Sequence, residues 1–355
     1  MRFSHETLVV RHGRRTEFPI IVALHSTILG PAVGGCRVRH YDDFQAAIED
    51  ALMLAEAMTY KAAVVDNGTG GGKSVACVPV DWSGFQSPDA RTALFLDIAE
   101  IVDGFGGSYH VAPDVGSTAD DMAVIARRTP HVAGLPLLFG GAGGTSHGTA
   151  IGLFAALKLA ASKLFVSHDL AGLTVAVQGL GGVGSALLAL LAHAKASVVA
   201  TDLDQSKREM VEKSGARWVD AEAIAGQSCD ILAPCALGGV LDGPTVAGLN
   251  CKLIVGAANN QLAHPEIEQA ILARGITYVP DFVANAGGLA YSSGIEIHRL
   301  SAAASAKRVE DRIRGVLERA FEMQELGISL TKAAYRIAED RLRAGGFTGP
   351  PAAFG

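Results

Sequence analysis

The sequence predicts an α/β protein of two domains, one of them built on a doubly wound parallel sheet. Three observations support this prediction. The chain has 355 residues, well beyond the roughly 150 residues of one average domain. In its second half, short apolar segments alternate with helical ones, as in a parallel sheet covered by helices on both faces. Between the halves, residues 140–148 are rich in glycine and have the composition of a hinge.

In the first half of the chain, segments of strand and helix character are mixed. Residues 18–24 are apolar and rich in β-branched side chains, which predicts a strand. Residues 44–58 form a long amphipathic segment after two aspartates that can cap a helix. Further predicted elements are strands at 62–65 and 74–78, on either side of a glycine loop, and a helix at 91–102.

The second half begins with a helical segment at 149–163 and then alternates regularly. Its strands are short and continuously apolar, which is typical of strands that are buried on both faces. Two long charged amphipathic helices end the chain. The predicted strands are 173–178, 197–201, 231–234 and 253–255, and the predicted helices are 183–194, 206–214, 301–326 and 330–343.

Composition excludes several classes of protein. The formal net charge is −6 and no basic face is visible, so we expect no nucleic-acid partner. The most apolar stretch, residues 187–192, is far shorter than the ~20 residues that cross a membrane. The N-terminal residues lack the apolar core of a signal peptide. The 5 cysteines have no CxxC spacing, which predicts reduced thiols of a cytoplasmic protein and neither a metal site nor a disulfide framework.

A glycine motif in the second half predicts a dinucleotide site. Gly179-Leu180-Gly181-Gly182-Val183-Gly184 fits the pattern GxGxxG, follows an apolar strand and opens a helix. Gly179 permits the tight turn, Gly181 lets a pyrophosphate approach the backbone at the helix N-terminus, and Gly184 allows the helix to pack against the strand. The alternative is a glycine turn that binds no ligand.

The residue after the next strand predicts which dinucleotide binds. Asp202 follows that strand, at the position where an acid accepts hydrogen bonds from the adenosine ribose. Its charge would repel a 2′-phosphate, so NAD is favoured. Lys207 and Arg208 follow closely and keep NADP open as an alternative.

Two lysines and an aspartate are the candidate catalytic groups. Lys61 and Lys73 stand on either side of one turn, at the ends of two predicted paired strands. One ammonium group can bind a substrate carboxylate, and the other, desolvated near a like charge, can act as a base because its pKa is lowered. Asp114 lies in a mostly apolar segment. The alternatives are solvated surface lysines and a helix-capping aspartate.

Together these residues resemble the amino-acid dehydrogenase family that includes the glutamate, leucine, valine and phenylalanine enzymes. The short length resembles the leucine, valine and phenylalanine branch. The resemblance implies a substrate-binding and oligomerisation domain at 1–147 plus 325–355, and a Rossmann-type NAD-binding domain at 148–324, separated by a cleft. Besides the nucleotide loop, the matching segments are 29–37, 58–63, 70–73, 113–116, 233–239, 256–260 and 280–288.

The resemblance implies a role for each catalytic candidate. Lys61 matches the lysine that binds the substrate carboxylate, helped by the backbone near Gly34 and Gly35. Lys73 matches the catalytic base. Asp114 matches the aspartate that takes part in proton transfer and holds the amino group.

The resemblance also implies contacts to the cofactor and the substrate. Thr149 matches a threonine that contacts the nicotinamide carboxamide, and three asparagines match residues near the nicotinamide and the substrate. We expect Asn260 at the substrate and Asn259, Asn285, Cys235 and Ala236 at the cofactor. Departures from the family pattern stand at Cys36, where threonine is usual, at His147-Gly148, where Pro-Val is frequent, and at Ser292, where relatives are often apolar.

The residues expected to line the pocket for the substrate side chain carry no charge, which excludes glutamate. They are Val33, Ala112, Leu289 and, at the rim, Ser292. Leucine- and valine-type relatives usually carry alanine at the position of Ala112, and phenylalanine-type relatives usually carry glycine. We therefore expect a branched-chain substrate, with phenylalanine as the alternative.

The expected reaction is the reversible NAD-dependent deamination of such an amino acid to a 2-oxo acid, ammonia and NADH. The resemblance also implies a homo-oligomer, a dimer or an octamer. Two other functions stay open: a 2-hydroxy-acid dehydrogenase on the same nucleotide fold, which the paired lysines disfavour, and a non-catalytic NAD-binding sensor.

Overall fold

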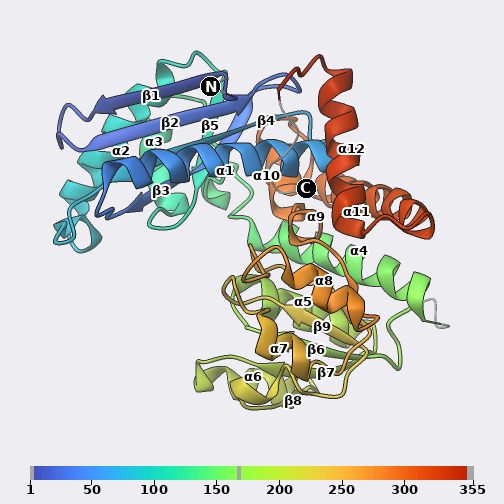
Figure 1. Cartoon of the computed structure of the whole chain (residues 1–355). Coiled ribbons are helices and arrows are strands. Elements are labelled where there is room, and N and C mark those ends of the chain that lie inside the picture. The colour runs from blue at the N-terminus through green and yellow to red at the C-terminus, as the bar shows by residue number, and fades with distance from the viewer. Residues whose placement is uncertain (1–3, 166–168, 350–355) are drawn as a thin grey trace. The chain divides into compact units, whose positions relative to one another are not determined.

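The computed structural model describes residues 4–165 and 169–349 and divides them into two compact units (Figure 1). The first unit comprises the described residues up to Gly144, Ser292–Ser305, and those from Tyr335 onward. The second comprises Thr145–Tyr291 and Ala306–Ala334. Relative to the expected domain boundaries, 292–305 falls in the first unit and 325–334 in the second. The chain passes between the units at Gly144, within the glycine-rich segment.

The first unit is built on a five-stranded mixed sheet of order β1-β2-β4-β3-β5. β3 pairs in parallel with both β4 and β5, whereas β2 is antiparallel to β1 and β4. Its elements are β1 (Thr7–His12), β2 (Pro19–Ser26), β3 (Ala32–Arg39), α1 (Phe44–Val64), β4 (Gly70–Cys77), η1 (Ser83–Phe85), α2 (Pro88–Asp103), β5 (Tyr109–Pro113), α3 (Ala119–Ala126) and η2 (Leu137–Phe139).

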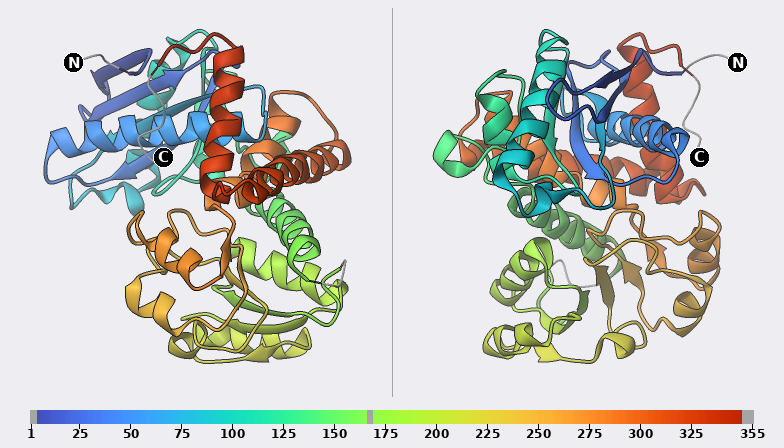
Figure 2. Two further views of the ribbon diagram at one scale, coloured as in Figure 1. Left: turned by 45° about the vertical axis from the view of Figure 1, so that its right-hand side comes forward. Right: turned by 90° about the vertical axis from the view of Figure 1, so that its left-hand side faces the viewer.

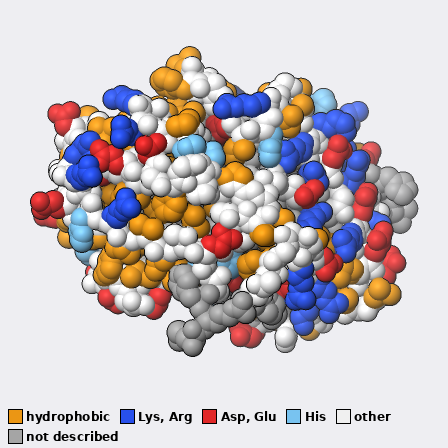
Figure 3. All heavy atoms as spheres, turned by 90° about the horizontal axis from the view of Figure 1, so that it is seen from above, with side chains coloured by type: hydrophobic (Ala, Val, Ile, Leu, Met, Phe, Trp, Pro, Cys, Tyr) orange, Lys and Arg blue, Asp and Glu red, His pale blue; other side chains and the backbone are white. Residues whose placement is uncertain are grey.

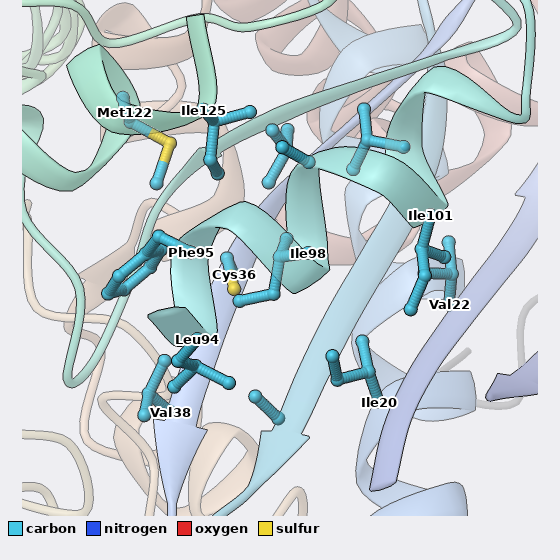
Figure 4. Close-up of a cluster of buried hydrophobic side chains, with 14 of the residues drawn as sticks. Ile20, Val22, Cys36, Val38, Leu94, Phe95, Ile98, Ile101, Met122 and Ile125 are labelled. Atoms are coloured by element: carbon cyan, nitrogen blue, oxygen red, sulfur yellow. The ribbon is translucent and has the colours of Figure 1, made fainter. Parts of the chain in front are cut away.

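Helices cover both faces of this sheet. The alanines of α1, among them Ala51 and Ala55, pack against Ile21 and Val75 on one face. Their small side chains let the helix backbone approach the strands closely. On the other face, α2 and α3 supply large apolar side chains such as Phe95 and Met122, which form the main core of the unit (Figure 4).

The second unit holds a six-stranded parallel sheet of order β11-β10-β9-β6-β7-β8. The strand order reverses direction at β6, so α5 and α6 lie on one face and α7 and α8 on the other (Figure 2). This is the predicted doubly wound sheet. Its elements are α4 (Ser146–Leu164), β6 (Thr174–Gln178), α5 (Gly182–His193), β7 (Ser197–Thr201), η3 (Gln205–Lys207), α6 (Arg208–Lys213), β8 (Arg217–Trp218), η4 (Ala221–Ala223), β9 (Ile231–Pro234), α7 (Gly243–Gly248), β10 (Leu253–Ile254), α8 (Ile267–Ala273), β11 (Thr277–Tyr278) and α9 (Asp281–Ala284).

Three helices end the chain: α10 (Gly287–Glu296), α11 (Ala302–Glu325) and α12 (Leu330–Ala344). The last two agree closely with the predicted helices, because long amphipathic periodicity is a strong local signal.

One predicted strand is wrong. Residues 62–65 do not form a strand, since α1 continues to Val64. A short apolar run fits a buried helix end as well as a strand, and alanine favours the helix. The predicted glycine loop is also absent, because Gly70–Cys77 is strand β4.

Candidate active site

Apart from Gly34, the residues of β3, β4 and β5 that were predicted to form the substrate site share one face of the first sheet. Gly35 pairs with Ala112 and Val33 pairs with Gly71. Directly paired residues point to the same face, and so do alternate residues along a strand. This is the face that α1 covers, since Val75 packs against the alanines of α1. It carries Val33, Gly35, Arg37, Gly71, Lys73 and Ala112.

Lys73 and Asp114 form an ion pair on this face. Lys73 Nζ lies 2.7 Å from Asp114 Oδ2, and the two side chains are 6% and 24% exposed. Burial lowers the pKa of Lys73 and outweighs the opposing effect of Asp114, and the nearby Arg37 lowers the pKa further. Burial alone would raise the pKa of Asp114, but Lys73 and Arg37 outweigh it and the pKa is lowered. A buried amine whose pKa is lowered is suited to act as a general base.

Gly35 of β3 makes room for this pair, and Gly34 lets β3 approach the backbone of β4. A Cβ atom at Gly35 would lie 2.6 Å from Asp114 Cβ and 3.2 Å from Lys73 Nζ. A Cβ atom at Gly34 would lie 1.7 Å from the carbonyl oxygen of Gly72 on β4. Neither position accepts a side chain without displacing backbone or a charged group.

Lys61 lies in the last turn of α1 and not on a strand. The expected arrangement of two lysines on paired strands is therefore wrong, although α1 covers the sheet face that carries Lys73. A Cβ atom at Gly71 would lie 2.1 Å from the backbone nitrogen of Thr59 on α1. The glycines before Lys73 thus let the helix that carries Lys61 pack directly on β4.

Sequence reasoning assigned no role to Arg37, Asp50 or Tyr41. The Arg37 guanidinium bonds both Asp114 and Asp50, and the Tyr41 hydroxyl donates to Asp50. Arg37 could have been found from strand alternation, because it lies two residues after Gly35 and so shares its face.

In the second unit, the glycine loop connects β6 to α5. Gly179 has φ 94°, and a Cβ atom at Gly184 would lie 1.9 Å from the carbonyl oxygen of Gly179. Among the described residues, a Cβ atom at Gly181 would meet no atom within 4 Å. No side chain from this part of the chain caps the N-terminus of α5 at Gly182, so its N–H groups can bind an anion. Open space at Gly181 and this uncapped helix end fit a dinucleotide pyrophosphate.

Asp202 directly follows β7 and is held in place by the loop. Its Oδ2 accepts a hydrogen bond from Leu180 N at 2.6 Å and its Oδ1 accepts one from Asp204 N at 2.9 Å. Lys207 Nζ lies 3.0 Å from Oδ2. Burial tends to raise the pKa of Asp202, but these hydrogen bonds and Lys207 lower it.

The remaining predicted cofactor residues lie in the same unit. Ala236 lies beside the glycine loop, since a Cβ atom at Gly179 would lie 2.7 Å from Ala236 Cβ. Cys235 N donates to Gln178 O at 2.7 Å. Asn285 Nδ2 donates to Asn259 Oδ1 at 2.9 Å.

Asn285 fits a ligand contact because its Oδ1 is buried without a hydrogen-bond partner among the described residues. Asn260 has φ 51° and donates its N–H to Asp281. Thr149 is buried in α4, and a Cβ atom at Gly288 would lie 2.4 Å from its Oγ1.

The departures at His147 and Gly148 have a packing explanation. A Cβ atom at Gly148 would lie 2.3 Å from Tyr291 Cβ, so glycine lets α4 and α10 approach closely. The exposed His147 ring stands edge-on to Tyr291, with centroids 5.3 Å apart. Leu289 lies in the second unit, beside Gly288, while Ser292 is assigned to the first and buries an Oγ that has no partner among the described residues.

Within the described ranges, no three His, Cys, Asp or Glu side chains are grouped as a metal ion requires. No helix of this part of the chain has the length and apolar character to span a membrane. On the face shown in Figure 3, basic and acidic side chains are interspersed.

Comparison with known proteins decides the family. The family model "Glu/Leu/Phe/Val dehydrogenase, dimerisation domain" matches residues 3–131, and "Glutamate/Leucine/Phenylalanine/Valine dehydrogenase" matches residues 200–344. The chain belongs to the Glu/Leu/Phe/Val dehydrogenase family. It is an NAD-dependent amino-acid dehydrogenase. A third model, "D-isomer specific 2-hydroxyacid dehydrogenase, NAD binding domain", matches residues 154–237, which lie within the nucleotide-binding unit.

The relatives within the family differ in substrate. Leucine dehydrogenase of Bacillus subtilis is 40% identical over 96% of this chain and 92% of its own length. Phenylalanine dehydrogenase of Thermoactinomyces intermedius is 36% identical over 96% of this chain and 92% of its own length. The crystal structure of L-tryptophan dehydrogenase from Nostoc punctiforme has a TM-score of 0.84 at 35% identity, covering 96% of this chain and 97% of that one.

Proposed function

We propose that the protein catalyses the reversible NAD-dependent oxidative deamination of a branched-chain L-amino acid, such as leucine or valine. The observation that carries this proposal is the Lys73–Asp114 ion pair, 2.7 Å long, on the sheet face that also bears Val33 and Ala112. A buried amine beside a carboxylate suits proton transfer, and small apolar neighbours suit an aliphatic side chain.

The proposed roles follow the chemistry of each side chain. Lys61 binds the substrate carboxylate, with the backbone near Gly34 and Gly35 completing the contact. Asp114 holds the amino group and takes a proton from it. NAD, when held by the glycine loop, would supply the hydride acceptor for the α-carbon, so that the substrate becomes a protonated imine.

Hydrolysis of the imine completes the reaction. Lys73 removes a proton from water as the oxygen attacks the carbon of the protonated imine, and Asp114 returns to the nitrogen the proton that it took from the amino group. The C–N bond then breaks while the hydroxyl proton passes to the ionised Asp114, and ammonia and the 2-oxo acid are released.

We propose that the cofactor site consists of the loop Gly179–Gly184, with Asp202 at the adenosine ribose. Thr149, Asn259, Asn285, Cys235 and Ala236 complete it around the nicotinamide end. The open space at Gly181 and the unpartnered Oδ1 of Asn285 support this assignment. Asn260, Leu289 and Ser292 are proposed for the substrate.

We test the reaction by measuring NADH formation across a panel of L-amino acids, and ammonia dependence in the reverse direction. Turnover that is fastest with leucine or valine supports the proposal. A chain that binds NAD but turns over no amino acid is instead a sensor.

The substrate assignment has its own test at Ala112, whose methyl group narrows the pocket. Ala112→Gly should shift the ratio of kcat/KM values toward phenylalanine by roughly tenfold, because one methylene in an apolar pocket discriminates by ~1–3 kcal/mol. A native enzyme that already prefers phenylalanine, or an unchanged ratio in the variant, contradicts the branched-chain assignment.

We also propose a homo-oligomer, a dimer or an octamer, because the family model over residues 3–131 is described as a dimerisation domain. Sedimentation of the purified protein tests this. The cytoplasmic location expected from free cysteines stays a prediction.

A further inference from the structure

Asp114 is bound by two cations through one oxygen. Its Oδ2 accepts from Lys73 Nζ at 2.7 Å and from Arg37 Nε at 3.0 Å. Its Oδ1 accepts no hydrogen bond from the described residues. One oxygen is therefore fixed by the protein and the other stays available to a substrate amino group.

Arg37 is itself fixed by a second carboxylate. Its Nη1 donates to both oxygens of Asp50 on α1, at 3.0 and 2.9 Å. The Tyr41 hydroxyl donates to Asp50 as well, and the guanidinium of Arg39 stacks 4.8 Å from the Tyr41 ring centroid. The Arg37 and Asp50 side chains are only 18% and 16% exposed. The guanidinium therefore bridges Asp114, the candidate catalytic carboxylate, and Asp50 on α1, the helix that carries Lys61.

We propose that Arg37 is a positioning residue, which aims Asp114 and stabilises its ionised form before and after each proton transfer, also while Lys73 is neutral, and that Asp50 and Tyr41 hold Arg37 in place. This inference rests on the proposed function, in which Lys73 accepts a proton from water. Neutral Lys73 gives Asp114 no charge compensation, so a lysine alone would stabilise the carboxylate in only part of the cycle. Arginine does not deprotonate in proteins, so its charge is present throughout.

The surroundings of Asp114 support this assignment. The charged groups that act on it are Lys73 of β4 and Arg37 of β3. Two further titratable groups nearby remain neutral: burial raises the pKa of the Cys36 thiol to about 12, and burial raises that of the Tyr109 hydroxyl still further. Arg37 is therefore the constant positive charge at this carboxylate.

The test replaces Arg37 by methionine, which keeps the length of the side chain but removes the charge. Asp114 then keeps Lys73 as its sole cationic partner, so the acidic limb of the kcat/KM–pH profile should move upward by about one unit or more, since one Arg neighbour lowers a carboxyl pKa by ~1–3 units. Arg37→Lys should restore part of the shift. Asp50→Asn should give a smaller shift, because the bond from Nε to Asp114 remains.

Arg15→Met is the matched control. Arg15 also bonds two carboxylates, Asp97 and Glu100, in the first unit. Its loss should lower the Tm and leave the pH profile unchanged. If Arg37→Met likewise lowers the Tm without moving the pH profile, Arg37 is merely structural and the proposal is wrong.

A second readout separates this inference from the proposed reaction. The 13C carboxyl resonance of Asp114, assigned by comparison with Asp114→Asn, reports its titration without turnover. We expect a higher pKa in Arg37→Met than in the native protein. An unchanged Asp114 pKa in Arg37→Met would contradict the proposed role of Arg37. A raised Asp114 pKa in a protein that turns over no amino acid would contradict the proposed function and leave the role of Arg37 standing.

Discussion

Lys73 and Lys61 have different surroundings, and the difference predicts different kinetic defects. Lys73 is buried in an ion pair with Asp114, and removal of a general base typically lowers kcat by ~10²–10⁴-fold. Lys73→Ala should therefore lose at least that factor in kcat and still bind NAD, as measured by calorimetry. Lys61→Ala should chiefly raise the KM for the amino acid, because a charge-assisted contact to the carboxylate is lost. A near-normal kcat in Lys73→Ala would contradict the assignment.

Asp202 is the second residue whose surroundings lead to a prediction, because we propose that it sets the preference for NAD. It accepts from Leu180 N and Asp204 N and is paired with Lys207. Repulsion of a 2′-phosphate by about 1.4 kcal/mol corresponds to tenfold in kcat/KM. We expect NAD to be preferred by at least roughly that factor.

The Lys207 partner of Asp202 provides the control for cofactor choice. Lys207→Ala should leave the kcat/KM for NAD nearly unchanged and widen the preference over NADP. If the native protein prefers NADP, Lys207 binds the phosphate instead.

At the scale of elements, the packing of α1 on β4 depends on glycine. A Cβ atom at Gly71 would lie 2.1 Å from Thr59 N and 2.6 Å from Ala55 O. Both are backbone atoms of α1, so the helix must move. Gly71→Ala should lower the free energy of unfolding by about 1–3 kcal/mol, as overpacking does, and should lower activity because α1 carries Lys61. Chemical denaturation measures the first effect.

Gly315 in α11 is the matched control for Gly71. A Cβ atom there would meet no atom of residues 4–165 or 169–349 within 4 Å, and alanine is favoured over glycine inside a helix by ~1 kcal/mol. Gly315→Ala should therefore leave stability unchanged or raise it. Equal destabilisation of the two variants would show that the α1–β4 contact has no special role.

For the whole molecule, buried histidines predict acid sensitivity. His25 is 1% exposed, and burial, with a smaller contribution from His5, lowers its pKa from 6.5 to about 4. The unfolded chain therefore binds a proton at His25 before the folded protein does. The contribution of His25 to the free energy of unfolding should be fully present above pH 6.5. It should be lost as the pH drops toward 4, which amounts to about 3 kcal/mol for this group.

His25→Gln tests this, since glutamine does not titrate and can still bond Thr59, the partner of His25 Nδ1. Denaturation at pH 7 and pH 4.5 should show a smaller loss of stability in the variant than in the native protein. Equal losses would mean that other groups govern the acid response.

Local sequence patterns determined the central strands of the nucleotide-binding unit, its helices α4 and α5, and the terminal helices, whereas β8, α7, α8 and β11 were not predicted. A GxGxxG loop, continuous apolar strands and amphipathic periodicity depend on neighbours in the chain, and each predicted its element nearly to the residue. The identities of Lys61, Lys73 and Asp114 also came from sequence, through the family resemblance.

Tertiary structure alone decided where those side chains lie. The glycines before Lys73 resemble a loop in sequence, yet they form strand β4, where a Cβ atom at Gly71 would meet the backbone of α1. Arg37 bonds Asp114 and Asp50, which are separated from it by 77 and 13 positions in the sequence. No local pattern reports such a contact, because it exists only once the strands and α1 have packed together.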